Sequence, residues 1–287
     1  MILDDWLQKA QNNGLRIYDF ASMGADGSQY RRMSLANGCN NSYSVAKAFT
    51  VTAIGMLWDQ GRIDVGDRVY ELLADEFPRE FDPRFREVTV EHLLTHRAGF
   101  GRGFLDIDAE NIGDYPSHDF LQIVLSEPLP YEPGSHYQYT DAAFYLLSRI
   151  VTHITGEKLD DFLRPVLYET MGFQEMAWSC CPLGYTMGAT GLYISTKDMV
   201  KLGWVYVNGG EYEGKRVVSE AWVEQVLSRG YEFTRRDENG TYAKGGMFGQ
   251  MLCFSLPRRE AYAWHAYETR RDVGVLLKDL ADRSGNA

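Results

Sequence analysis

Hydrophobic and polar positions follow two different periods along this chain, a strand-like period near both ends and a helical period between them. After a helical segment at residues 3–13, "LRIYDFASM" and "QYRRMSLAN" predict two strands joined by a turn at "GADGS". Near the other end, "GQMLCFSL" and "AYAWHAY" predict a second pair around "PRRE", followed by a helix in "RRDVGVLLKDLADRS". The two hairpins are expected to pair into one antiparallel sheet.

The middle of the chain is dominated by helical spacing. A predicted helix runs from Ser44 through "VAKAFTVTAIGMLWDQG" and ends at Gly61. Residues 62–175 then indicate helices and long loops, and helical pattern returns in "TKDMVKLGWVYVNG" and "SEAWVEQVLSRG". This order predicts an α+β fold with residues 1–60 and 176–287 in a sheet lobe flanked by helices. Residues 61–175 are expected to form an inserted, mainly helical lobe, and the two lobes are expected to make one unit with a cleft between them.

Composition limits the possible partners. The chain has 287 residues, 45% of them hydrophobic, and a formal net charge of -11. This charge disfavours nucleic acid and anionic membrane surfaces, so the expected partner is a small molecule or short peptide. No apolar run is long enough for a membrane segment, and "MILDDWLQKAQNNG" is unlike a signal peptide. We therefore expect a cytoplasmic protein, or an extracytoplasmic one if a signal segment has been removed from the sequence, and the oligomeric state stays unknown.

The four cysteines do not suggest a special site. Cys39, Cys180, Cys181 and Cys253 have neither the density of a disulfide framework nor the paired spacing of a zinc site. Reduced thiols in the core are the expectation.

The candidate chemistry begins with "NNSYSVAKAFT", where Ser44 and Lys47 stand three residues apart at a helix start. A hydroxyl there faces free backbone N–H groups, and a lysine at i+3 lies on the same side of the helix. If burial disfavours its charged form, that lysine can accept the serine proton. The four-residue pattern alone is more typical of a capping serine and a solvated lysine.

The neighbouring blocks favour the catalytic interpretation. Ser44 and Lys47 are followed by "WDQGRIDVGDRVYELL", "VTVEHLLTHRAGF" and "YEPGSHYQYTDAAFYLLSRIVTHITG". In this order the sequence resembles the serine β-lactamase and penicillin-binding-protein superfamily, in particular the branch of class C β-lactamases, D-alanyl carboxypeptidases and related esterases. The resemblance runs from about Ser44 to Val200 and resumes near Lys244.

The resemblance implies a β-lactamase/transpeptidase-like fold and a serine hydrolase that forms an acyl-enzyme on an amide, ester or β-lactam carbonyl. No cofactor and no metal are implied. Two alternatives stay open, namely a penicillin-binding-like module with little turnover and a catalytically silent interaction domain.

The second motif of the superfamily, Tyr-x-Asn, matches Tyr139-Thr140-Asp141 only in part. By resemblance, Tyr139 relays protons between the nucleophile and the leaving group. Asp141 replaces an uncharged amide, and we expect its carboxylate within a few Å of Lys47. Such an anion favours the protonated lysine, shifts proton transfer towards Tyr139, and repels substrate carboxylates.

The third motif, Lys-Thr-Gly or His-x-Gly on an inner strand, is similar to Lys244-Gly245-Gly246, which stands directly before a predicted strand. By resemblance, Lys244 binds a substrate carboxylate, and the Met247 backbone N–H joins that of Ser44 in an oxyanion hole. A glycine-rich hairpin turn with a solvated lysine is the alternative.

Three other features are weaker candidates. His92 and His96 lie at i and i+4, but their order differs from that of the helical zinc motif. His265 alternates with aromatic residues in a predicted strand and is expected to be packed or at an edge. The acidic residues 106–114 have the wrong spacing for an EF-hand and predict a solvated loop.

Overall fold

The structure is a computed structural model that describes residues 2–238 and 240–284. The chain divides into two compact units. We call residues 1–45, 166–177 and 192–287 the sheet unit, and residues 46–165 and 178–191 the helical unit.

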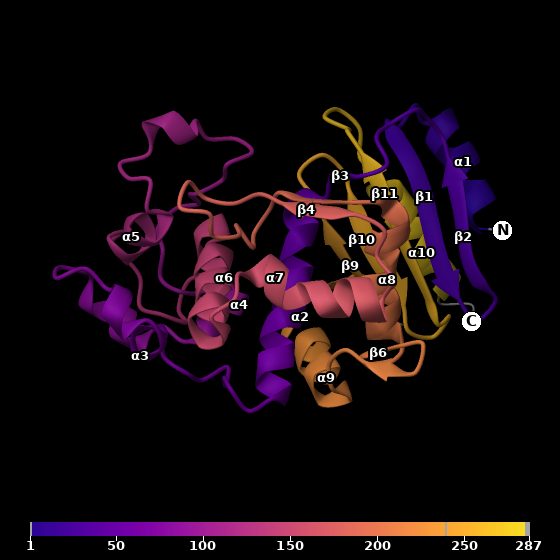
Figure 1. Ribbon diagram of the computed structural model, residues 1–287. Coiled ribbons are helices and arrows are strands. Elements are labelled where there is room, and N and C mark those ends of the chain that lie inside the picture. Colours follow the sequence, from indigo (N-terminus) through magenta and orange to yellow (C-terminus); the bar gives the residue numbers. More distant parts are fainter. Residues whose placement is uncertain (1, 239, 285–287) are drawn as a thin grey trace. The chain divides into compact units, whose positions relative to one another are not determined.

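The sheet unit is built on a six-stranded sheet in which each strand runs antiparallel to its neighbours, in the order β2-β1-β11-β10-β9-β8 (Figure 1). The strands are β1 (Ile17–Gly24), β2 (Gly27–Arg32), β8 (Thr234–Arg235), β9 (Thr241–Gly245), β10 (Met251–Ser255) and β11 (Glu260–Ala266). The predicted pairing of the two terminal hairpins is confirmed, because β1 pairs with β11 along Ile17–Met23. The α+β fold class is confirmed with it.

One face of this sheet is covered by the terminal helices α1 (Ile2–Asn12) and α10 (Gly274–Ser284). Trp6 of α1 is fully buried, and its ring lies 5.0 Å from that of Tyr262 and 5.4 Å from that of Trp264. Its indole N–H donates a hydrogen bond to Asp279 of α10 at 3.0 Å. Aromatic residues at alternating strand positions thus join the two ends of the chain in one core.

The opposite face of the sheet packs against α8 (Thr196–Val207), which contacts β1, β10 and β11. A side chain at Gly203 would place its Cβ 3.0 Å from Leu252 and 3.1 Å from Ala261, so glycine allows the helix to approach closely. Ser195 caps α8 by accepting a hydrogen bond from the Asp198 N–H at 3.1 Å. Asp198 itself lies in the first turn of α8, where the helix dipole favours a negative charge.

The remaining elements of the sheet unit are short. The strand β3 (Asn40–Asn41) pairs with β5 (Leu192–Ile194), and β4 (Met176–Trp178) follows β5 in the strand order. The unit also contains a further hairpin and a helix, namely β6 (Glu211–Tyr212), β7 (Lys215–Arg216) and α9 (Glu220–Arg229).

The helical unit is organised around α6 (Asp141–Thr155), which contacts α2, α3, α4, α5 and α7. These helices are α2 (Ala46–Asp59), α3 (Val69–Leu72), α4 (Val90–Leu94), α5 (Phe120–Leu125) and α7 (Leu159–Arg164). The side chain of Thr140 caps α6, and Gly156 ends it in a left-handed conformation. Asp141, the first residue of α6, is held where the helix dipole favours a negative charge.

The observed units differ from the predicted lobes in three ways. Helix α2 belongs to the helical unit, because its apolar surface packs on α6 and α7. Residues 166–175, predicted in the helical lobe, belong to the sheet unit, and residues 178–191, predicted in the sheet lobe, belong to the helical unit. The predicted lobe ends at residues 1 and 287 lie outside the described residues.

Several local predictions need correction. The helix predicted from Ser44 to Gly61 starts as a 3-10 turn and becomes α-helical at Ala46. The second strand ends at Arg32, earlier than "QYRRMSLAN" indicated. The thiols are free, but Cys180 is exposed and Cys39 half-buried, so the expectation of core thiols is wrong for both. Among the described residues, no helix combines the length and apolar character needed to cross a bilayer.

Candidate active site

Ser44 lies in the 3-10 turn Tyr43–Val45 that leads directly into α2. The residue is half-buried. The preceding residue, Tyr43, adopts a left-handed conformation with φ 49°, and its backbone N–H donates to the Asn41 side chain at 2.9 Å. Non-glycine residues are held in this region only where the surroundings enforce it, often at functional sites. The strained backbone at Tyr43 therefore fixes the position of the turn that carries the Ser44 hydroxyl.

The hairpin between β9 and β10 lies against this turn. A side chain at Gly246 would place its Cβ 2.7 Å from the Ser42 carbonyl oxygen, so only glycine lets the two backbones meet here. The Phe248 ring contacts the Tyr43 ring edge-on, with centroids 5.0 Å apart. The structure thus brings Gly246 to the Ser44 turn within the sheet unit, with Gly245 beside it at the end of β9 and Met247 exposed in the turn.

Lys47 lies in α2, within the helical unit, and is completely buried. Its ammonium donates to Asp141 Oδ1 at 2.6 Å and to the Ala189 carbonyl at 3.0 Å. The ring centroids of Tyr139 and Phe144 lie 4.8 and 5.8 Å from Lys47 Nζ. Each of these neighbours favours a cation. The expected closeness of Asp141 to Lys47 is confirmed, and the pair is a buried salt bridge.

Tyr139 is positioned by His96, a residue with a left-handed φ of 56° that lies just after α4. The two rings are 4.4 Å apart, and His96 Nδ1 accepts a hydrogen bond from the Thr140 N–H at 3.3 Å. The His96 carbonyl accepts another from the Gln138 N–H at 2.8 Å. His96 is buried and accepts hydrogen bonds from the residues before and after Tyr139. It therefore fixes the loop that carries the Tyr139 phenol.

Acidic side chains near the Lys47 pair make hydrogen bonds of their own. Asp106 Oδ1 accepts from the Asp108 N–H at 3.2 Å, and the Asp108 carboxylate bonds to the Thr190 hydroxyl. Burial, followed by the charge of Asp141, raises the pKa of Asp106, and Lys47 opposes the shift. No group of three or more potential metal ligands occurs among the residues that the structure describes.

Lys244 lies on β9 itself, so the prediction that it stands directly before a strand is wrong in its placement. Its side chain is only 10% exposed, and its ammonium forms a salt bridge with the Glu232 carboxylate. The cation is therefore neither solvated nor directed to bulk water, which argues against the simple hairpin-turn alternative. Whether it binds substrate stays a prediction.

The predicted residues fall into two groups. Ser44, Lys244, Gly245, Gly246 and Met247 belong to the sheet unit, and Lys47, Tyr139 and Asp141 belong to the helical unit. Ser44 and Lys47 are joined by two residues of continuous helical chain, so a single turn of helix links the groups. Their catalytic roles stay predictions.

The sequence motifs did not reveal the roles of Glu232 and His96, whereas the expected packing of His265 is confirmed. Glu232 had no motif around it, and His96 was considered only as a metal ligand, although its block "LLTHRAGF" belonged to the resemblance. His92 completes the capping box of α4. His265 is packed in β11, where burial lowers its pKa to about 4.

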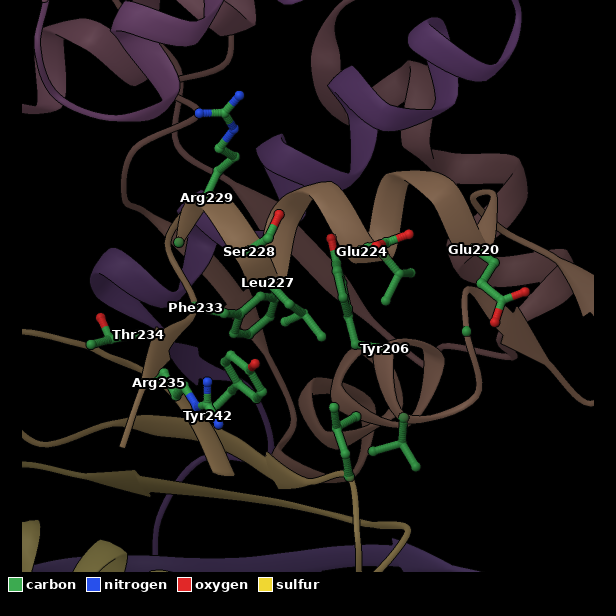
Figure 2. Close-up of a pocket in the computed structure, with 15 residues that line it drawn as sticks. Tyr206, Glu220, Glu224, Leu227, Ser228, Arg229, Phe233, Thr234, Arg235 and Tyr242 are labelled. Atoms are coloured by element: carbon green, nitrogen blue, oxygen red, sulfur yellow. The ribbon is translucent and has the colours of Figure 1, made fainter. Parts of the chain in front are cut away.

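A pocket of about 910 Å³ lies elsewhere in the sheet unit, between α9, the end of α8 and β8 (Figure 2). Tyr206, Phe233 and Tyr242 contribute its aromatic side, while Glu220 and Glu224 project from α9. None of the predicted site residues lines this pocket.

The fold is shared by solved structures of other proteins. A family VIII carboxylesterase has a TM-score of 0.73, with 15% identity over 99% of this chain and 96% of that chain. The Beta-lactamase family matches residues 36–266, so the chain belongs to the Beta-lactamase family.

Two curated relatives are similar to parts of this chain. The 6-aminohexanoate-dimer hydrolase of Paenarthrobacter ureafaciens is 25% identical over 73% of this chain and 56% of its own length. A Salmonella agona protein that carries the name of a D-alanyl-D-alanine carboxypeptidase is 27% identical over 52% of this chain and 36% of its own length. The chain thus spans between about a third and just over half of these relatives.

Proposed function

We propose that the protein is a serine hydrolase that acts through an acyl-enzyme, with Ser44 as nucleophile. The observation that carries this proposal is the buried Lys47, one helical turn after Ser44. Lysine is almost never fully buried without a specific partner, and here Asp141, Ala189 and two aromatic rings hold it. A cation fixed at such a position can orient and stabilise the groups that exchange a proton with the serine.

In the proposed reaction, Ser44 Oγ bonds to the substrate carbonyl carbon while its proton passes towards the leaving group. Tyr139 relays this proton, because the Asp141 carboxylate, 2.6 Å from the Lys47 Nζ, favours the protonated lysine. The backbone N–H groups of Ser44 and Met247 stabilise the oxyanion. The carbonyl then loses an amine or alcohol, and water releases the acid and restores Ser44.

The proposed substrates are neutral amides and esters. Amide and ester bonds are the ones implied by the names of the related 6-aminohexanoate-dimer hydrolase and carboxylesterase. The Asp141 carboxylate neutralises the Lys47 ammonium, so this pair offers no net positive charge to the carboxylate of penicillins and D-alanyl peptides. We therefore expect weak β-lactam turnover.

The test is intact-mass spectrometry after exposure to a fluorophosphonate. We expect one adduct per chain, and none in Ser44→Ala. The matched control is Ser42→Ala, which alters a buried serine in the same region and should keep the adduct. Labelling that persists in Ser44→Ala, in a variant with an unchanged melting temperature, would assign the nucleophile elsewhere.

A penicillin-binding-like module with little turnover is the second candidate function. The Lys47–Asp141 salt bridge favours it, since an ammonium cannot accept a proton from the deacylating water. Time-resolved mass spectrometry with a penicillin and with an activated ester separates the two. A hydrolase loses the ester-derived acyl group within minutes, whereas the binding module keeps both adducts.

A further inference from the structure

The salt bridge between Lys244 and Glu232 is a feature of the sheet unit that the proposed function has not used. The Lys244 side chain is 10% exposed and that of Glu232 only 3%. Ionised side chains are seldom buried this far unless they are paired. The Glu232 carboxylate is therefore paired with the Lys244 ammonium, the group that a substrate carboxylate would otherwise bind.

The backbone at Glu232 is held in an uncommon conformation. Its φ is 64°, and the flanking Phe233 N–H donates to the Tyr231 carbonyl at 2.8 Å, which closes a tight three-residue turn. Tyr231 and Phe233 are fully buried on either side. Their rings contact Trp222 at 6.0 Å and Phe254 at 5.1 Å. Such a turn is unfavourable for a non-glycine residue. The buried side chains of Tyr231 and Phe233 stabilise it and hold the Glu232 carboxylate in place.

Lys244 also has a defined relation to the nucleophile turn. On β9 it pairs with Leu252 of β10, and it precedes Gly246 by two residues. Gly246 is the residue whose backbone meets the Ser42 carbonyl, two residues before Ser44. The cation and its partner therefore stand on the strand end that reaches the Ser44 turn.

We propose that Glu232 is a specificity-determining residue that acts as an internal substitute for a substrate carboxylate. By holding the Lys244 ammonium, it excludes substrates that carry a carboxylate beside the reacting bond and admits neutral amides and esters. This inference rests on the proposed hydrolase function. It adds a second acid to Asp141, so that both lysines of the candidate site, Lys47 and Lys244, are already neutralised by the chain itself.

The experiment compares two substrates of similar size, the 4-nitrophenyl monoester of succinic acid and 4-nitrophenyl pentanoate. In wild type we expect kcat/KM for the anionic ester to be at least about tenfold below that for the neutral one. Glu232→Gln keeps the shape and removes the charge, which lets Lys244 bind the substrate carboxylate. The anionic-to-neutral ratio should then rise about tenfold.

Two variants serve as controls. Glu224→Gln makes the same change of net charge at an exposed position on α9 and should leave the ratio unchanged. The double variant Glu232→Gln/Lys244→Met removes the proposed binding cation and should lose the gain. An unchanged ratio in Glu232→Gln, or an equal gain in Glu224→Gln, would overturn the proposal. Equal rates for both esters in wild type would overturn it without any variant.

A binding measurement separates this proposal from the proposed function. Calorimetry with phenylacetate tests the carboxylate site without any chemistry. We expect Glu232→Gln to bind phenylacetate at least about tenfold more tightly than wild type, and the double variant to lose this gain. Equal affinities refute the role of Glu232, whereas absent fluorophosphonate labelling together with the affinity gain refutes only the Ser44 hydrolase.

Discussion

The buried salt bridge between Lys47 and Asp141 should contribute far more to stability than a salt bridge at the surface. The perturbation is the removal of either charge, by Asp141→Asn or Lys47→Met, and of both together. Both residues lie in the helical unit, and their side chains are 0% and 8% exposed. Neither charge is fully hydrated, so each depends on the other.

The size of the effect follows from the geometry. Two unit charges 2.6 Å apart attract each other by about 6 kcal/mol at an effective dielectric constant of about 20. Breaking a buried salt bridge by removing one partner costs about 3–5 kcal/mol. In Asp141→Asn the new amide would keep one oxygen for Lys47, and Ala189 would keep its hydrogen bond at 3.0 Å. We therefore expect a loss of about 3 kcal/mol for this variant, the lower end of that range.

Urea unfolding of the four proteins in this double-mutant cycle gives the coupling energy. The loss in free energy of unfolding in the double variant should be smaller than the sum of the two single-variant losses by at least about 2 kcal/mol. The control is a second cycle on Arg68 and Glu87, a salt bridge of 3.1 Å in the same unit with side chains 49% and 61% exposed. Exposed salt bridges contribute about 0.2–1 kcal/mol. A buried coupling no larger than the surface one would refute the reasoning.

Three further predictions concern catalysis and pH. Lys47→Ala and Tyr139→Phe should each lower the acylation rate by about a hundredfold or more, measured by stopped-flow with an activated ester, and near-normal rates in both would argue against a role of these residues in acylation. Asp141→Asn should raise kcat/KM for an anionic β-lactam about tenfold more than for a neutral ester, whereas equal changes would show that its charge does not select substrates. Burial lowers the pKa of His265 from 6.5 to about 4 in the folded protein. Between these two pH values the imidazole is therefore protonated in the unfolded chain but neutral in the folded one. Stability should therefore fall as the pH drops from about 6.5 to about 4, by up to about 3 kcal/mol, and unfolding of His265→Gln over this range should lack that part of the loss.

Local patterns of the sequence determined several of the main strands and helices and their order along the chain. Alternation in "LRIYDFASM" and "AYAWHAY" predicted β1 and β11, because successive side chains of a strand point to opposite faces. The spacing of Ser44 and Lys47 placed them one helical turn apart, which depends on the chain alone. The motif Tyr139-Thr140-Asp141 indicated an anion near Lys47, and the structure places it there.

Long-range packing decided what no local pattern contained. Helix α2 follows the first hairpin in sequence, yet it belongs to the helical unit because its surface fits α6 and α7. Cys180 is apolar in type but exposed, since burial depends on which neighbours cover a residue.

In the candidate site too, local motifs determined some features and long-range packing determined others. The sequence indicated a lysine at position 244, but its charge is neutralised by Glu232, which lies in an unmarked segment twelve residues earlier. Likewise, His96 positions Tyr139 from a loop more than forty residues away. A motif fixes residue types and their spacing along one segment. The protonation and orientation of those residues depend on burial and on partners that only the folded chain brings together.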